Sequence, residues 1–158
     1  MNMLKSVCVS QVLFILMISS GVAGSEIAPD ARDKCAVCGM FVAKFPDWTA
    51  MIEYQNGRRV WFDGVKDLMK GYTNPAKYGL PAERSTVKSI WVKDYYSLKL
   101  IDGRNAFYVI GSNVSGPMGK ELIPFFKEKE AQGFQKDHQG EKVLRFNQLT
   151  ADLLKKAD

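Results

Sequence analysis

The chain has 158 residues, enough for one ordinary domain or two very small ones. Hydrophobic residues make up 46% and charged residues 25%, proportions that are typical of a globular protein and exclude a disordered or fibrous chain. The formal net charge is +5, and the basic residues are scattered rather than massed with interleaved aromatic residues. This pattern argues against nucleic-acid binding and favours an ordinary solvated surface.

The first 23 residues have the pattern of a secretory signal peptide. Lys5 supplies the positive end, residues 7–18 are mostly apolar, and small side chains precede a cleavage position after Ala23. The apolar run is shorter than the ~20 residues that span a bilayer, so an uncleaved membrane anchor is the less favoured alternative. A lipid anchor is not supported, because no cysteine directly follows the apolar run. We therefore expect a periplasmic or otherwise exported protein that meets the membrane only through its signal peptide and is soluble after cleavage.

Two cysteines remain after this cleavage, and they follow a polar segment, 24–34, that we expect to be a flexible leader. Cys35 and Cys38 are spaced C-x-x-C, and Met40 adds a thioether two residues later. A disulfide is one interpretation, because an exported pair of this spacing can be oxidised. A thioredoxin-like site is not favoured, because the residues that follow are extended and turn-like in pattern rather than helical. Haem attachment lacks its histidine after Cys38, and a zinc site of four thiolates lacks its second cysteine pair.

The soft ligands of this segment favour a soft metal ion, and Cu(I) is the ion we expect. Cu(I) prefers thiolate, thioether and imidazole ligands, and the mature chain offers one thiol pair, several methionines and a single histidine. The thiolates would anchor the ion, and a thioether would discriminate against hard ions such as magnesium and calcium.

The first part of the mature chain is predicted to fold as strand, strand, helix, strand. Asn56-Gly57, a strong hairpin signal, separates the first two strands. Asp63 suits the N-cap of the helix. Apolar residues then recur at helical spacing, at Val65, Leu68, Met69 and Tyr72. The expected elements of this part are strands at 48–54 and 58–62, a helix from 65, a surface loop at 73–85, a strand at 86–93 and a short strand at 98–101.

The same order of elements recurs in the second half. Pro124 lies in an extended segment and argues for an edge position, since proline cannot donate to a neighbouring strand. We therefore predict an α+β fold of two tandem ββαβ units, 35–101 and 106–158, packed on each other because each is too small to bury much core alone. The expected elements of the second unit are a strand at 106–110, a loop at 111–119, an extended segment at 121–125, a helix at 127–137, a strand at 142–146 and a tail helix at 149–156.

The second unit contains two further candidate metal ligands. Met118 lies between Pro117 and Gly119 in a loop, where no periodicity would bury it, although core filling is the ordinary role of methionine. His138 shares a helix face with Phe134, and on spacing alone a core residue or a charge at the helix C-terminus is the favoured interpretation.

Three motifs in order resemble the NosL family of copper-binding accessory proteins, which serve nitrous oxide reductase maturation. They are Cys-Ala-Val-Cys-Gly-Met at 35–40, the run 107–112 leading to Gly-Pro-Met-Gly at 116–119, and Asp-His-Gln-Gly at 137–140. The resemblance covers nearly all of the mature chain. It implies two tandem ββαβ units, a topology also seen in organomercurial lyase.

The resemblance also implies Cu(I) binding and delivery toward the copper–sulfur centre of the reductase. It places the metal ligands at Cys35, Cys38, Met118 and His138, with Met40 more readily explained by packing. This sequence departs from the family in two ways. Many members are lipoproteins, whereas here no cysteine directly follows the apolar run. A glycine often follows the histidine in the family, whereas here Gln139 separates His138 from Gly140.

We therefore expect a Cu(I) metallochaperone without catalytic activity, whose partner is a copper-receiving reductase. The alternative is a thiol-disulfide oxidoreductase that uses Cys35 and Cys38, which would require a lowered thiol pKa. Organomercurial cleavage, by analogy of fold, has little support, because the sequence places no acid beside the thiols.

Overall fold

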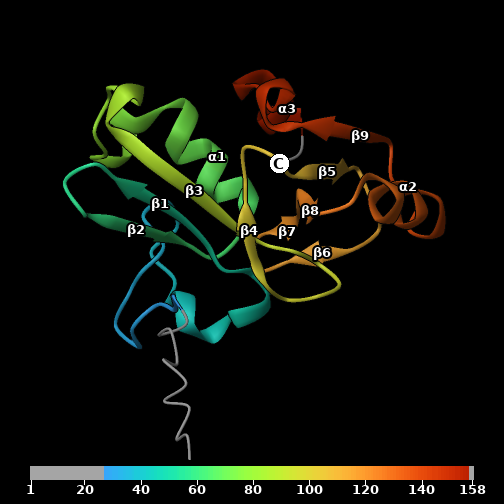
Figure 1. Cartoon of the computed structure of the whole chain (residues 1–158), viewed down its shortest axis with the longest axis horizontal. Coiled ribbons are helices and arrows are strands. Elements are labelled where there is room, and N and C mark those ends of the chain that lie inside the picture. The colour runs from blue at the N-terminus through green and yellow to red at the C-terminus, as the bar shows by residue number, and fades with distance from the viewer. Residues whose placement is uncertain (1–26, 157–158) are drawn as a thin grey trace, which may run out of the picture.

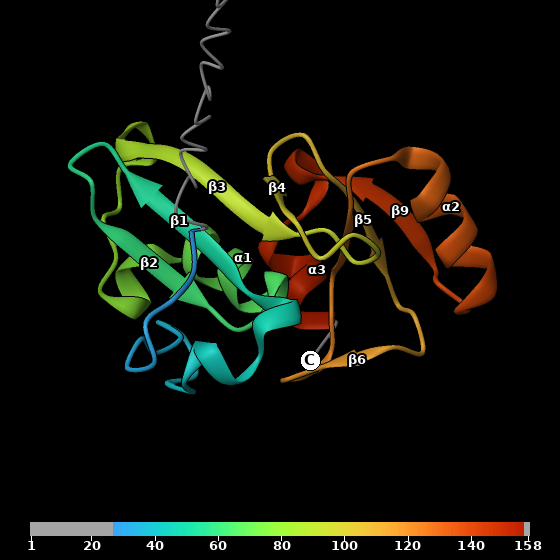
Figure 2. The same ribbon diagram turned by 60° about the horizontal axis from the view of Figure 1, so that its bottom comes forward.

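The structure is a computed structural model that describes residues 27–156 (Figure 1). The predicted signal peptide, residues 1–23, lies outside this range. Within the range, no helix is both long enough and apolar enough to span a bilayer. Two antiparallel sheets lie side by side, each with its own helix (Figure 2). This arrangement confirms the predicted α+β fold.

The first sheet has four strands in the order β2-β1-β3-β4, with helix α1 connecting β2 to β3. The turn between β1 and β2 contains Asn56-Gly57, as predicted, and Gly57 adopts a positive φ of 81°. Val65, Leu68 and Met69 of α1 are buried, which confirms the predicted apolar face. The elements are β1 (Ala50–Tyr54), β2 (Arg59–Phe62), α1 (Val65–Thr73), β3 (Val87–Lys93) and β4 (Leu100–Asp102), with short 3-10 helices at Val42–Lys44, Pro46–Trp48, Pro75–Tyr78 and Arg84–Thr86.

The second sheet has three strands in the order β8-β5-β9, and α2 connects β8 to β9. Pro124 lies on the edge strand β8, as predicted. A two-stranded hairpin, β6–β7, occupies most of the segment that we expected to be a loop. The elements are β5 (Phe107–Ile110), β6 (Ser115–Gly116), β7 (Gly119–Lys120), β8 (Ile123–Phe125), α2 (Glu128–Asp137), β9 (Lys142–Arg145), a 3-10 helix (Phe146–Gln148) and α3 (Ala151–Lys156).

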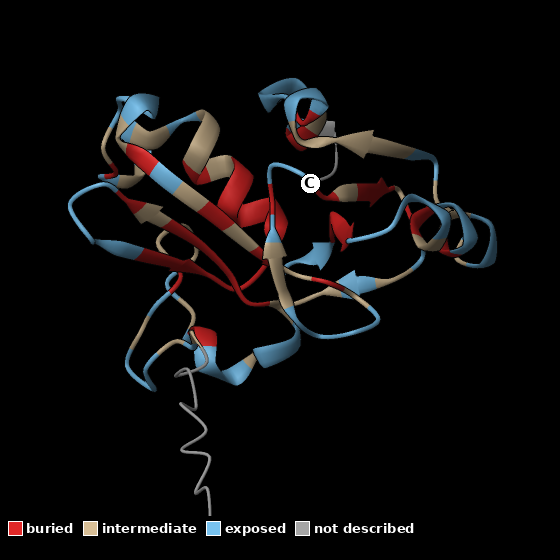
Figure 3. Ribbon diagram, viewed as in Figure 1, coloured by how far each residue is buried: buried red, intermediate tan, exposed pale blue. Residues whose placement is uncertain are grey.

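One hydrophobic core continues from the first unit into the second. Tyr108, Leu122 and Leu154 belong to the same buried cluster as the first sheet and α1. Helix α3 packs against α1. Figure 3 shows buried segments in both units. The hydroxyl of Tyr108 donates a hydrogen bond of 2.5 Å to the carbonyl of Gly103 at the junction of the units. A smaller cluster lies between α2 and its own sheet. The two units are therefore packed on each other as predicted, while their limits at 101 and 106 stay a prediction.

Candidate metal centre

The cysteine motif forms a closed turn. The N–H of Cys35 donates to the carbonyl of Met40 at 2.8 Å, and the N–H of Gly39 donates to the carbonyl of Cys35 at 2.9 Å. Gly39 has a φ of 79°, a left-handed conformation that glycine adopts without a Cβ clash. A further hydrogen bond of 3.2 Å, from the N–H of Ala36 to the carbonyl of Trp61, ties the turn to the end of β2. The sequence thus holds both thiols beside the segment that leads into α1.

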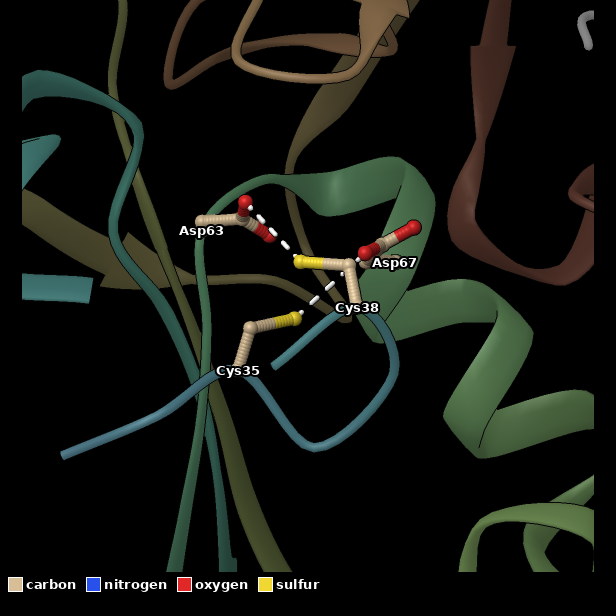
Figure 4. A group of neighbouring side chains, drawn as sticks. All are labelled: Cys35, Cys38, Asp63 and Asp67. Atoms are coloured by element: carbon tan, nitrogen blue, oxygen red, sulfur yellow. Dashed lines mark hydrogen bonds between the residues drawn. The ribbon is translucent and has the colours of Figure 1, made fainter. Parts of the chain in front are cut away.

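Two aspartates of this segment face the thiols. The thiol of Cys38 donates to Asp63 Oδ2 at 3.2 Å, and the thiol of Cys35 donates to Asp67 Oδ2 at 3.4 Å (Figure 4). One ligand atom from each of the four side chains lies within 4.8 Å of every other. Cys35, Asp63 and Asp67 are buried, and Cys38 is partly exposed. The structure therefore contains a compact cluster of two thiols and two carboxyl groups, with both cysteines free.

Burial controls the protonation of this cluster. Removal from water raises the pKa of Cys38 to about 11 and raises the pKa of Cys35 further still. Burial also raises the pKa of Asp67 above its ordinary value. At neutral pH both thiols therefore keep their protons, and a metal ion must displace these protons to bind thiolate.

Asp63 does not cap α1, which corrects the N-cap prediction. The N-cap is Gly64, and it makes no side-chain capping bond. A carboxylate from the second unit takes the role instead: Glu121 accepts hydrogen bonds from the N–H of Lys66 at 2.5 Å and from that of Leu122 at 2.9 Å. A Cβ at Gly64 would collide with the Glu121 carboxylate, so only glycine fits there without a shift. Asp63 is consequently free to face Cys38.

Met118 lies in the turn of the β6–β7 hairpin, and 41% of its surface is exposed. Its carbonyl accepts a hydrogen bond of 2.9 Å from the side-chain ammonium of Lys66. Lys66 lies in the first turn of α1, between Asp63 and Asp67 in sequence. The hairpin turn is thus attached to the same end of α1 that carries the carboxyl groups of the cluster.

His138 lies apart from this cluster. It is the C-cap of α2, and its ring stacks on Phe134 with centroids 4.2 Å apart. Its carbonyl accepts a hydrogen bond of 3.0 Å from the N–H of Asn113, at the start of the segment that leads to the hairpin. Figures 1 and 2 both place α2 away from the cysteine segment, with the hairpin between them. The structure therefore brings Cys35 and Cys38 together without His138, and the ligand roles of Met118 and His138 stay predictions.

Sequence reasoning missed the metal-ligating potential of the two aspartates. The sequence pattern favours a capping role for Asp63 and gives no reason to single out Asp67; in the structure Asp63 precedes α1 and Asp67 lies in its first turn. The available signal was only the acidic pair itself, directly after a strand and beside an apolar helix face.

The structure is therefore an α+β protein of two packed ββαβ units. Among residues 27–156 it has one candidate metal centre, the buried cluster of thiols and carboxyl groups beside α1. The NosL family model matches residues 26–154, so the chain belongs to the NosL family. The copper-binding lipoprotein NosL of Stutzerimonas stutzeri is 30% identical over 128 residues, which cover 79% of this chain and 66% of that protein. The match therefore spans slightly less than two thirds of the relative's length.

Two solved structures are also similar. The crystal structure of the copper chaperone NosL from Shewanella denitrificans aligns with a TM-score of 0.68 at 26% identity, covering 80% of this chain and 96% of that one. The solution structure of apo-NosL from Achromobacter cycloclastes aligns with a TM-score of 0.47 at 25% identity, covering 66% and 87% of the two chains. The names of the Stutzerimonas and Shewanella proteins denote a copper-binding protein and a copper chaperone rather than enzymes, which supports a non-enzymatic protein.

The name of the Stutzerimonas relative also describes that protein as a lipoprotein. For this chain the sequence pattern does not support a lipid anchor; that interpretation depends on residues outside the described range, disagrees with the relative's name, and stays a prediction.

Proposed function

We propose that this protein is an exported Cu(I) metallochaperone. It binds one Cu(I) ion through Cys35 and Cys38, with Met118 and His138 completing the ligand set, and delivers the ion to a copper-receiving reductase, for which nitrous oxide reductase is the candidate. The observation that carries the proposal is the pair of free thiols held beside each other by the 35–40 turn. Thiolate pairs are ligands that a soft monovalent ion prefers over harder donors.

The exposure of the ligands supports transfer to a partner. Cys35 is buried, whereas Cys38 is partly exposed and Met118 is 41% exposed. A partner protein can therefore approach the ion from the side of Met118 and Cys38 while Cys35 still holds it. Handover by ligand exchange needs such an open side, since each new ligand must reach the ion before an old one leaves.

One continuous segment supports the inclusion of Met118 and His138. Residues 111–121 start beside His138, through the Asn113 contact, and end at the first turn of α1, through Glu121 and the Met118 carbonyl. The segment therefore holds the backbone of Met118 at the end of α1 that carries the carboxyl groups of the cluster, and its other end contacts the backbone of His138.

The proposal is tested by titrating the reduced protein with Cu(I) against a competing Cu(I) chelator. We expect one tightly bound ion per chain. Cys38→Ser and Met118→Ala should each weaken binding by at least about tenfold, as loss of a direct ligand should cost no less than loss of a group supporting one. Leu98→Ala is the matched control, because Leu98 is an apolar side chain of similar exposure, 44%, outside the cluster. Equal copper affinity in all four proteins would refute the ligand set.

Delivery is tested separately by mixing the copper-loaded protein with copper-free nitrous oxide reductase. Copper should appear in the reductase faster than from the chelator alone at the same free Cu(I) concentration. Equal rates would refute delivery to this partner without contradicting the proposed copper binding.

The oxidoreductase alternative is not favoured by the protonation of the thiols. Catalytic exchange cysteines have a lowered pKa, because the thiolate is the attacking species. Here burial raises the pKa of Cys38 to about 11, in the opposite direction.

A further inference from the structure

A groove opens directly beside the cysteine turn. Its volume is about 420 Å³, and Val37, the residue before Cys38, forms part of its wall. The other walls come from α1, from the 3-10 helix Pro75–Tyr78 and from α3, which packs against α1 (Figure 2). Because Cys38 is partly exposed, the groove lies where a partner protein can approach this outer thiol.

The groove is lined by positive charge. Lys70, Lys77 and Lys155 line it, and no acidic residue among residues 27–156 does. The ammonium groups of Lys70 and Lys155 lie 3.8 and 3.6 Å from carboxyl oxygens of Asp67 and Asp152, which compensate part of the charge. Asp67 is 1% exposed, so a partner cannot contact its carboxyl group. The three ammonium groups thus outnumber the carboxyl groups beside them, and the fold gathers lysines that are scattered in the sequence.

Two further lysines border the end of the cysteine turn. The ammonium groups of Lys34 and Lys44 lie 5.1 and 5.6 Å from the ring centre of Phe41, which directly follows the 35–40 turn. A backbone bridge pairs Lys34 with Phe41, so these charges are attached to the turn. The Phe41 ring is 38% exposed and offers apolar contact area between the two ammonium groups.

Positive charge therefore borders the cysteine turn both at Phe41 and in the groove. We call the five lysines at these two places the lysine face: Lys34, Lys44, Lys70, Lys77 and Lys155.

The lysine face fits an extended acidic surface better than a small anion. Sites for small anions commonly use the fixed fork of arginine, whereas lysine is a flexible point charge, and no arginine among residues 27–156 lines the groove. Lys34 and Lys44 lie over Phe41 and do not line the groove, so an ion bound in the groove would leave them unused.

The aromatic rings of this surface argue against a nucleic acid. Single-stranded nucleic acids stack their bases on open aromatic faces. Here Phe41 has two ammonium groups above its ring, and Tyr78 has that of Lys77 at 5.2 Å from its ring centre. The lysines thus occupy the ring surface that bases would need.

We propose that the lysine face docks an acidic surface of the protein that receives the copper ion. The identity of this partner rests on the proposed function, whereas the sign of its charge rests on the lysines. Opposite charges attract over about one screening length, ~10 Å at 0.1 M salt, and so speed the encounter of the two proteins. Docking places the partner against the 35–40 turn, where its own ligands reach the ion from the side of Cys38.

The surface is mapped first with an oligoglutamate peptide as the acidic probe. Amide NMR shifts of the reduced, metal-free protein are followed while the peptide is added. We expect the largest changes at Val37, Lys77 and Lys155, and we expect high salt to abolish them. Lys129 and Lys136 are exposed lysines of α2 and serve as internal controls.

Two outcomes of this mapping would overturn the proposal. Changes at the α2 lysines as large as those at the lysine face would show attraction without a docking surface. Equal changes at the same positions with inorganic phosphate, at the same total charge, would assign the groove to a small anion.

Charge reversal then tests the lysine face directly. The double variant Lys77→Glu with Lys155→Glu changes two exposed side chains of the face, and Lys129→Glu with Lys136→Glu is the matched control with the same change in net charge. Oligoglutamate affinity should fall at least about tenfold in the first variant and less than about threefold in the control. Cu(I) affinity, measured against a chelator, should match that of the native protein in both, because neither pair includes a candidate copper ligand. Equal losses of oligoglutamate affinity would overturn the proposal.

Copper transfer separates the docking surface from the proposed function. Transfer to copper-free nitrous oxide reductase should be at least about tenfold slower from the lysine-face variant than from the control variant at low salt, and the difference should shrink as salt screens the charges. Equal rates from the two variants would overturn docking at this face while leaving copper delivery in place. If the native protein transfers no copper to this reductase, delivery to that partner fails, and the oligoglutamate measurements still decide whether the lysine face selects an acidic surface.

Discussion

The carboxylate of Glu121 accepts a hydrogen bond from the backbone N–H of Lys66 at a distance of 2.5 Å. Because Glu121 directly follows β7, this bond joins the end of the β6–β7 hairpin to the first turn of α1. The same carboxylate accepts the N–H of Leu122. Because Asp63 and Asp67 flank Lys66 in sequence, this contact fixes the helix end that positions the metal cluster. The stability of the site therefore depends on a residue 55 positions away from Lys66.

Replacing Glu121 should destabilise the protein according to what the new side chain can accept. Glu121→Ala leaves two buried N–H groups without an acceptor, and we expect a loss of about 2–4 kcal/mol in the free energy of unfolding. Glu121→Gln keeps an acceptor oxygen of nearly the same shape and should cost less than about 1 kcal/mol. Urea denaturation at pH 5 measures both. Equal losses in the two variants would show that the hydrogen bonds do not matter.

Glu121 should also make stability fall as the pH rises. Burial raises the pKa of this carboxyl from 4.5 to about 7, so the folded protein holds the proton more tightly than the unfolded chain. Its contribution is complete below pH 4.5 and decreases as the pH rises toward 7, by about 3 kcal/mol at most. Unfolding free energies measured at intervals from pH 4 to 8 provide the check. The Glu121→Gln variant lacks this titrating group, so the fall should be smaller there, with a remainder from Asp67, whose pKa burial also raises; an equal fall in both proteins would assign it to other groups.

The sequence predicted correctly those features of the fold that depend on residues close together in the chain. The Asn56-Gly57 turn, the apolar face of α1 and the edge position of Pro124 depend on neighbours in sequence, and each was confirmed. The β6–β7 hairpin was missed because its strands have two residues each and are rich in glycine, serine and lysine. Strands this short have no alternation to detect.

The site was harder to predict because its partners come from distant segments. The spacing of Cys35 and Cys38 was visible in the sequence, but the partner of Asp63 is set by packing across 25 residues. The capping rule assigned Asp63 to the N–H groups of α1, and the structure gives that role to Glu121. A local preference was overridden by a tertiary contact that no single sequence pattern encodes.

The pH dependence of copper binding should reveal how many cysteines coordinate the ion. Burial holds the pKa of Cys38 near 11 and that of Cys35 higher, so both thiols are protonated from pH 6 to 8. Each thiol that becomes a thiolate on binding releases one proton, and Cu(I) affinity should rise about tenfold per pH unit for each. We expect a rise of about 100-fold per unit for the native protein and tenfold for Cys35→Ser. Chelator competition at several pH values, corrected for chelator protonation, measures the slope; a slope of one in the native protein would leave a single cysteine ligand.

Thiol labelling should be slow in the metal-free protein. With a pKa near 11 instead of 9.0, Cys38 has about a 100-fold smaller thiolate fraction at neutral pH than a free cysteine. Iodoacetamide, followed by mass spectrometry, should therefore label Cys38 about 100-fold more slowly than a model peptide, and the buried Cys35 more slowly again. Unfolding in denaturant should restore the ordinary rate. Rapid labelling of the folded protein would instead revive the oxidoreductase interpretation.

His138 should reveal whether its ring serves copper or only packing. The ring stacks on Phe134 with centroids 4.2 Å apart, so His138→Ala should cost about 0.5–1.5 kcal/mol of stability whether or not a metal binds. His138→Phe keeps an aromatic ring for this stacking and removes both nitrogens. We expect that variant to retain native stability and to bind Cu(I) at least about tenfold more weakly, because only the imidazole can be a ligand. If His138→Phe binds Cu(I) as tightly as the native protein, stacking on Phe134 is the whole role of His138 and the copper ligands are the sulfurs alone.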